Sequence, residues 1–199
     1  MKLLITTRAD GNIEWYTRYT HPIIKEYAES CGADFMILDH DPPSGTFDNR
    51  PHFRIMKHYD LHNEYDRILS IDSDIIVARN APNIFDEVPT DKIGVYLEDH
   101  DTKERQIDRR NKVKVCEESF GCIGFQENYI NSGALLTSNI HKDIFQPIDD
   151  KYWTGQGSDD VHLSYKICQL DMPIHSLSCK WNFQPGPHGH NISEAYFIH

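Results

Sequence analysis

The chain has 199 residues, of which 39% are apolar and 26% are charged, the composition of a globular protein that can bury a core. It carries 31 acidic and 20 basic residues, which gives a formal net charge of −11. Nucleic-acid-binding proteins usually present a basic face, so this balance argues against that class. An anionic ligand would need a cation to help it bind to so acidic a chain.

The cysteines and the start of the chain bear on the compartment. The five cysteines form no CxxC pair and are odd in number, which favours free thiols in a reducing compartment and argues against a zinc site. The apolar run 3–5 is too short for a secretory signal, and no run reaches transmembrane length. We therefore expect a cytoplasmic protein.

A strand–helix–strand unit opens the chain. Residues 3–5 predict a short buried strand, apolar residues at helical spacing predict a helix over about 14–30, and residues 34–38 predict a second strand. This order indicates a right-handed parallel unit. The polar residues 6–8 would then follow the first strand where it faces a nucleotide, although a plain loop explains them equally well.

The next strand carries two acids. After a helix that begins near Pro51 and includes Lys57 outside its apolar face, residues 67–77 are apolar except for a few polar positions that include Asp72 and Asp74. Two unpaired carboxylates in a buried strand would cost several kcal/mol each. We therefore expect the strand to end near Ile71, with the acids at its carboxyl edge, where ligands of open α/β sheets bind.

Mg²⁺ or Mn²⁺ takes one or two carboxylates together with substrate phosphates. The stretch Asp72-Ser73-Asp74 therefore predicts a site for a metal and a diphosphate. On this motif alone, a polar turn after a core strand is an equally good interpretation.

The second half adds further polar groups. A strand at 93–97 precedes a segment, 102–118, in which basic and acidic residues mix, and we expect a solvated helix or a mobile flap there. Residues 131–133 predict a tight turn before a core strand, with a glycine that would let the backbone approach a ligand. A helix to about Leu170 follows, with Ser158 or Asp159 as its N-cap.

The order Ile-Asp-Ser-Asp, Asn-Ser-Gly, Gly-Ser-Asp-Asp-Val and Phe-Ile-His resembles the metal-dependent, nucleotide-sugar glycosyltransferases of the GT-A fold, in particular those of the family-8 type. The resemblance covers most of the chain. It implies an α/β fold: a single Rossmann-like domain over residues 1–199, in which helices flank a mixed, mostly parallel sheet. The nucleotide would bind in about the first 100 residues and the acceptor in the remainder.

The resemblance also implies an activity, the transfer of a hexose from a nucleotide-diphosphate sugar, by family analogy a UDP-sugar, to a hydroxyl group of a glycan or glycoconjugate. The implied ligands of Mn²⁺ or Mg²⁺ are Asp72, Asp74 and His199. Implied neighbours of the nucleotide are Thr6, Thr7, Arg8, Lys57 and Ser73. Those of the donor sugar and the acceptor are Asn131, Ser132, Gly133, Asp159 and Asp160, the last two as catalytic candidates.

The chain departs from the family at two points. Asp160 stands where the family has an amide, and Tyr152-Trp153 before this acid pair is similar to inverting galactosyltransferases, in which one acid is the general base. We favour retention, with inversion left open. The family also continues past the histidine with a Gly and a Lys, so the chain is either a whole protein or one domain of a longer one.

Two other functions fit parts of the sequence. Haloacid-dehalogenase-like phosphatases use an Asp-x-Asp motif, but there the motif opens the first strand of the domain, and here a complete strand–helix–strand unit precedes it. A non-catalytic sugar-binding module would explain the aromatic residues, although it needs neither the clustered acids nor His199. Both remain alternatives to the transferase.

Overall fold

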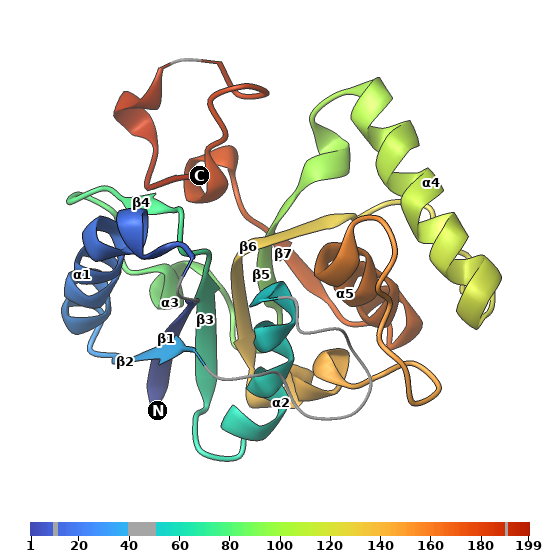
Figure 1. Cartoon of the computed structure of the whole chain (residues 1–199), viewed down its shortest axis with the longest axis horizontal. Helices are drawn as coiled ribbons and strands as arrows, with labels where there is room; N and C mark the ends of the chain where they lie inside the picture. The colour runs from blue at the N-terminus through green and yellow to red at the C-terminus, as the bar shows by residue number, and fades with distance from the viewer. Residues whose placement is uncertain (10–11, 40–50, 190) are drawn as a thin grey trace.

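The computed structural model describes residues 1–9, 12–39, 51–189 and 191–199. A six-stranded sheet in the order β2-β1-β3-β6-β5-β7 crosses it (Figure 1). The strands are β1 (Leu3–Arg8), β2 (Asp34–Leu38), β3 (Arg67–Ile71), β5 (Ile93–Leu97), β6 (Ile130–Ser138) and β7 (Ile174–Ser176). Among the described residues, only β6 runs antiparallel to its neighbours in this six-stranded sheet. The predicted mixed, mostly parallel α/β sheet is therefore confirmed.

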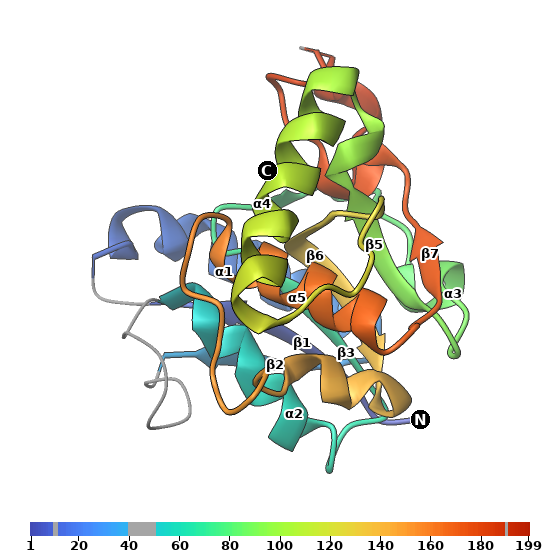
Figure 2. The ribbon, with the colours of Figure 1, turned by 90° about the vertical axis from the view of Figure 1, so that its right-hand side faces the viewer.

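Helices cover both faces of the sheet. Helix α1 (Glu14–Ser30) lies on one face, and the other carries the 3-10 segment Pro51–Lys57 with α2 (His58–Leu61), and α5 (Ser158–Gln169) (Figure 1). Helix α3 (Ile84–Glu87) lies on the α1 side, and α4 (Lys103–Phe120) packs outside α5, as Figure 2 shows. No helix among the described residues is long and apolar enough to cross a membrane.

Strand alternation divides the core into two layers. In β6, Ala134 and Leu136 point into the α1 layer while Leu135 points into the α5 layer. In β3, Leu69 joins the α1 layer and Ile68 the opposite face. Successive side chains on a strand face opposite sides, so both faces of these central strands are apolar and buried.

The topology brings the ends of several strands to one edge of the sheet. Strands β1, β3 and β5 finish there at Arg8, Ile71 and Leu97, and the antiparallel β6 begins there at Ile130. In the register of the sheet Ile71 lies opposite Ala134 and Leu97 lies opposite Ile130. Residues just after β3 and β5 therefore meet residues at the start of β6.

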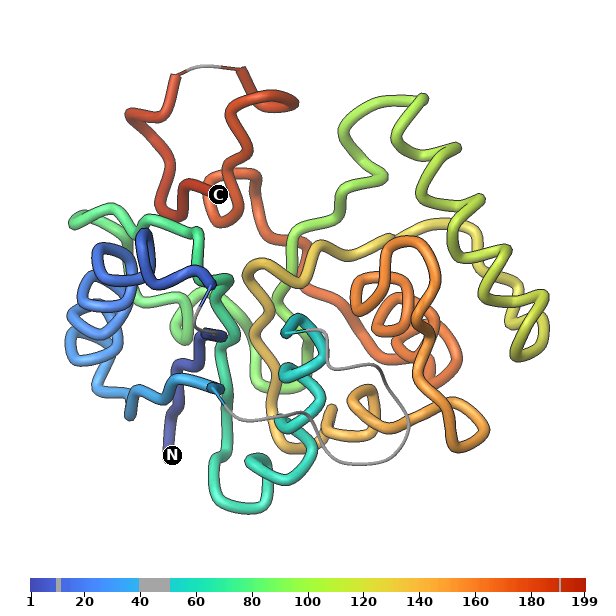
Figure 3. The backbone as a smooth tube through the Cα atoms, in the orientation of Figure 1, coloured from blue at the N-terminus to red at the C-terminus, as the bar shows by residue number. Residues whose placement is uncertain are grey.

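A small second sheet brings the end of the chain to the same edge. Strand β4 (Ile76–Val77) pairs antiparallel with β8 (Phe197–Ile198), with Ile76 opposite Ile198. Phe197 is fully buried and its ring lies edge-on to those of Tyr27 and Trp181. Figure 3 shows the C-terminal segment folding back over the first half of the chain. The residue after Ile198 thus lands beside the residues just before β4.

Three local predictions were wrong. Residues 6–8 do not follow the first strand, because β1 continues through them to Arg8. Residues 131–133 do not form a turn, because they belong to β6, where Asn131 lies opposite Tyr96 just past an irregularity between Val95 and Tyr96. The N-cap of α5 is Gly157, in the left-handed region with φ of 79°, and no side chain caps the helix. Of the two side chains expected to cap it, that of Ser158 donates a 3.4 Å hydrogen bond to the carbonyl oxygen of Gly155, and that of Asp159 accepts from Arg8 and Ser132.

Candidate functional site

Arg8, at the end of β1, joins three segments of the chain. Its guanidinium forms an ion pair with Asp72, and its Nη1 lies 3.2 Å from Oδ2 of Asp159. The same Nη1 donates a 2.8 Å hydrogen bond to the carbonyl oxygen of His52. The Arg8 side chain is 7% exposed, so this cation is held between the loop after β3 and the start of α5.

Asp72, Asp74 and His199 form an acid–histidine cluster. One ligand atom from each lies within 4.8 Å of the others. Nε2 of His199 is 3.8 Å from a carboxylate oxygen of Asp72 and 3.6 Å from one of Asp74. A cation with bonds of about 2.1–2.4 Å at right angles needs ligand atoms about 3.0–3.4 Å apart. The three groups therefore fit a divalent cation after a small approach, and their oxygen-rich donor set suits Mg²⁺ or Mn²⁺.

Gly133 makes room for this cluster. A Cβ atom on Gly133 would lie 2.6 Å from Cε1 of His199 and 2.8 Å from Oδ1 of Asn131. The carbonyl oxygen of Gly133 also accepts a 2.8 Å hydrogen bond from the backbone N–H of Asp72. The glycine expected to admit a ligand thus admits the imidazole ring of His199.

Replacing Gly133 by Ala is therefore expected to displace the His199 ring and to weaken Mn²⁺ binding about tenfold or more, a cost typical of misplacing a metal ligand. Calorimetric titration of the purified protein with MnCl₂ measures this. Gly186→Ala is the matched control, since nothing lies within 4 Å of a Cβ there. Equal Mn²⁺ affinity in the two variants would contradict the assignment.

The acid pair of α5 faces the start of β6. Oγ of Ser132 donates a 2.9 Å hydrogen bond to Oδ2 of Asp159, and the Ser132 backbone N–H donates one of 2.8 Å to Oδ1 of Asp160. Burial and the neighbouring Asp159 carboxylate raise the pKa of Asp160. The two acids are thus unlike: Asp159 is paired with a cation and a hydroxyl, and Asp160 favours holding a proton.

One cavity of about 310 Å³ connects these groups. It is lined by Arg8, His52, Asp72, Asn131, Ser132, Gly157, Ser158, Asp159, Asp160 and His199. Most of the predicted site residues therefore share one space, although they come from five segments of the chain.

Four of the predicted neighbours of the nucleotide, Thr6, Thr7, Ser73 and Lys57, do not line this cavity. Thr6 and Thr7 are fully buried in β1, with Oγ1 of Thr6 2.8 Å from Nε2 of His58, so their side chains face the interior. Ser73 lies beside the cluster in a neighbouring cavity, and its carbonyl oxygen accepts a 2.6 Å bond from Thr20.

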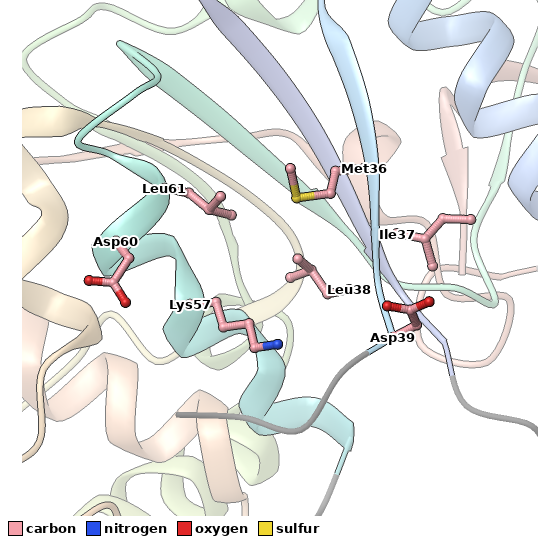
Figure 4. Close-up of a pocket in the computed structure, with 7 residues that line it drawn as sticks. All are labelled: Met36, Ile37, Leu38, Asp39, Lys57, Asp60 and Leu61. Carbon is pink, nitrogen blue, oxygen red and sulfur yellow. The ribbon is translucent and has the colours of Figure 1, made fainter. Parts of the chain in front are cut away.

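Lys57 lines a separate cavity of about 420 Å³ at the end of β2. Figure 4 shows its side chain extending toward Leu38 and Asp39. Lys57 is not among the residues that line either cavity beside Asp72. Its contact with a phosphate stays a prediction.

Sequence reasoning missed Glu98 and Asn182. Glu98, just after β5, is 4% exposed and contacts Arg105 and Arg109 of α4 at 3.1 and 2.6 Å. These two arginines therefore neutralise a buried acid, where a solvated helix was expected. Asn182 is fully buried, and its Oδ1 lies 2.7 Å from Nδ1 of His199. Its place between two aromatic residues, Trp181 and Phe183, was the available signal for a buried polar group.

Comparison with known proteins identifies solved structures that share this fold. No family model and no curated protein matches the chain. A solved glycosyltransferase involved in glycosylating the major capsid of PBCV-1 has a TM-score of 0.65 at 15% identity, over 100% of this chain and 93% of its own. The galactosyltransferase LgtC, solved with donor and acceptor sugar analogues, has a TM-score of 0.61 at 15% identity, over 98% of this chain and 86% of its own.

Mouse xyloside xylosyltransferase 1 has a TM-score of 0.58 at 13% identity, over 100% of this chain and 97% of its own. The chain therefore has the GT-A glycosyltransferase fold that the sequence resemblance predicted.

Proposed function

We propose that the chain is a hexosyltransferase. It would transfer a hexose from a nucleotide-diphosphate sugar, specifically a UDP-sugar, to a hydroxyl group of a glycan or glycoconjugate. Asp72, Asp74 and His199 would hold Mn²⁺ or Mg²⁺ for this reaction. The observation that carries the proposal is the cavity in which Asp72 and His199 of this cluster line the same space as the acid pair Asp159 and Asp160. A Drosophila galactosyltransferase with a TM-score of 0.50, solved with manganese, UDP-Gal and xylobiose, supports the choice of ligands.

The chain's own groups would divide the work between donor and acceptor. A bound divalent cation would neutralise charge on the leaving diphosphate. Arg8, Ser73 and the backbone around Thr6 and Thr7 belong to the nucleotide side, which we assign to about the first 100 residues. The remainder supplies the sugar side, where Asn131 and Ser132 offer hydrogen bonds to hydroxyl groups.

The acids have different roles in this scheme. Asp159 is held in place by Arg8 and Ser132, so its negative charge can stabilise positive charge on the sugar carbon. We propose retention, with the acceptor attacking from the side of the leaving phosphate. Asp160, whose pKa is raised, is the candidate general base if the enzyme inverts.

Asp160→Asn separates these outcomes, since it removes a base while keeping the shape and restoring the amide of the family pattern. With retention, the rate is expected to stay within about tenfold, whereas loss of a general base costs about 10²–10⁴-fold. Rates of sugar transfer, with the anomeric configuration of the product read by proton NMR, measure this. An inverted product with a rate loss of that size would overturn retention.

The function itself is tested by incubating the protein with Mn²⁺ and a panel of UDP- and GDP-sugars. Slow, metal-dependent release of free sugar and UDP is expected, because a transferase without acceptor passes the sugar to water. Hydrolysis of phosphate monoesters instead would indicate a phosphatase. Binding of sugars without any hydrolysis would indicate a sugar-binding module, and either result would overturn the proposal.

A further inference from the structure

We propose that Glu98, Asn131 and Asn182 form a polar relay that sets the tautomer of His199, with the proton on Nδ1 and the lone pair of Nε2 directed at Asp72 and Asp74. These are positioning residues, since they act through the imidazole ring. The inference rests on the proposed metal site for its purpose, but the tautomer itself can be measured without any metal.

The relay starts at Glu98, which has only acceptor atoms when ionised. Nε of Arg109 lies 2.6 Å from one carboxylate oxygen, and Arg105 lies 3.1 Å from the other. Burial raises the pKa of Glu98, but the hydrogen bond from Asn131 and the two guanidinium groups outweigh it, so the pKa is lowered. Every group that faces this carboxylate must therefore donate.

Asn131 is oriented at both ends. Its amide nitrogen is 2.6 Å from Oε1 of Glu98, so this end must be the NH₂ group. Its other end accepts a 2.9 Å hydrogen bond from the backbone N–H of Gly133, which can only donate. The two contacts are independent, and both place Oδ1 of Asn131 away from Glu98.

Asn182 passes this polarity to the ring. Its amide nitrogen lies 2.6 Å from Oδ1 of Asn131, so it donates there and leaves its own Oδ1 as an acceptor. That oxygen is 2.7 Å from Nδ1 of His199, which must therefore carry a proton. In the neutral ring Nε2 is then unprotonated, the form that binds a metal.

The backbone keeps this geometry in place. Phe183, next to Asn182, donates from its N–H to the carbonyl oxygen of Phe197 and accepts from the N–H of His199, both at 2.8 Å. Asn182 is fully buried, so water does not compete for its amide. The relay also connects α4 to the cluster, because Arg109 supplies the first charge. A metal-bound histidine is commonly oriented in this way by a hydrogen bond to its second nitrogen.

The tautomer is measured on metal-free protein at pH 8 by long-range ¹H–¹⁵N correlation of the imidazole nitrogens. The signals of His199 are those absent from His199→Ala. A protonated Nδ1 and an unprotonated Nε2 are expected in the natural chain. A ring protonated on Nε2 instead would overturn the proposal.

Two variants test the relay, and one serves as control. Asn182→Ala removes the acceptor. Asn131→Ala removes the oxygen that orients the Asn182 amide, so that this amide can reverse, and it covers the case in which the first variant does not fold. Each is expected to give a mixture of tautomers and a 10–100-fold weaker affinity for Mn²⁺ by calorimetry. Ser164→Ala, which removes a buried 3.1 Å bond to the N–H of Ile130 outside the relay, should change neither.

Folded variants that keep a single Nδ1-protonated tautomer would overturn the relay, whatever their stability. If the tautomers shift as expected but His199→Ala leaves Mn²⁺ affinity unchanged, the relay is supported and the metal role of His199 fails. The two failures are therefore distinguishable.

Discussion

Asp74→Asn is expected to weaken Mn²⁺-dependent binding of UDP by more than about 100-fold, beyond what the loss of an outer-shell partner costs. The variant keeps the size of the side chain but removes one of the two carboxylates in the cluster with His199. The side chain of Asp74 is 59% exposed, so the urea unfolding curve should stay the same. Titration calorimetry with UDP, with and without Mn²⁺, measures the effect.

Asp86→Asn controls for the change in net charge. Asp86 is an exposed acid on α3 that is not part of the cluster. Its substitution should leave UDP affinity unchanged. If both variants bind UDP and Mn²⁺ like the natural chain, the cluster is not the metal site.

Acidification from pH 8 to pH 5 is expected to remove folding stability through the buried histidines, which must stay neutral. Proton uptake by Asp160, whose pKa is raised, offsets part of this loss. Burial lowers the pKa of His62 to about 4 and that of His162 to about 4, and it also lowers those of His58 and His141. In His162, Nε2 lies 3.0 Å from the carbonyl oxygen of Gln146, while Nδ1 accepts a bond from the N–H of Trp153. A proton on Nδ1 would face that N–H.

The direction in which stability changes with pH depends on whether the folded or the unfolded state binds more protons. The folded-state pKa of each ring lies below the unfolded value of about 6.5, so the unfolded chain takes up protons first as the pH falls. Stability is fully present above pH 6.5 and declines between pH 6.5 and about 4. For pKa values of 6.5 and 4, the loss at pH 5 is about 2 kcal/mol per ring.

Urea unfolding at pH 8, 6.5 and 5 measures this loss, with His162→Gln as the test and the exposed His100→Gln as the control. The His162 variant should be less stable at pH 8 but lose about 2 kcal/mol less than the natural chain on acidification. The control should follow the natural chain. A pH dependence equal in all three proteins would contradict the role of His162.

Local sequence patterns predicted most of the elements near the site. Helix α1 has its predicted bounds, and β3 ends at Ile71 because two carboxylates cannot continue a buried strand. Asn83 caps α3, accepting from the N–H of Phe85. Each of these features depends on neighbours only a few positions away, which a single sequence displays.

Local sequence patterns could not predict the relay. Its hydrogen bonds join Glu98 to Asn131 and Asn131 to Asn182, residues 33 and 51 positions apart. Asn131 resembled a turn residue because Asn, Ser and Gly favour turns, but pairing with β5 and side-chain hydrogen bonds override that preference. Gly133 was expected to let the backbone approach a ligand, and in the structure the imidazole ring of His199 lies where a Cβ atom of residue 133 would be.

The sequence by itself determined the opening strand–helix–strand unit and the acids at the end of β3, since burial, periodicity and the cost of an unpaired charge act along the chain. Only the tertiary structure decided that Arg8 joins Asp72 to Asp159 and that β8 carries His199 to Asp74. It also decided which α4 arginines neutralise Glu98. The physical reason is that sheet register and strand order bring distant residues together, and buried polar groups then bond to whichever partners that order supplies.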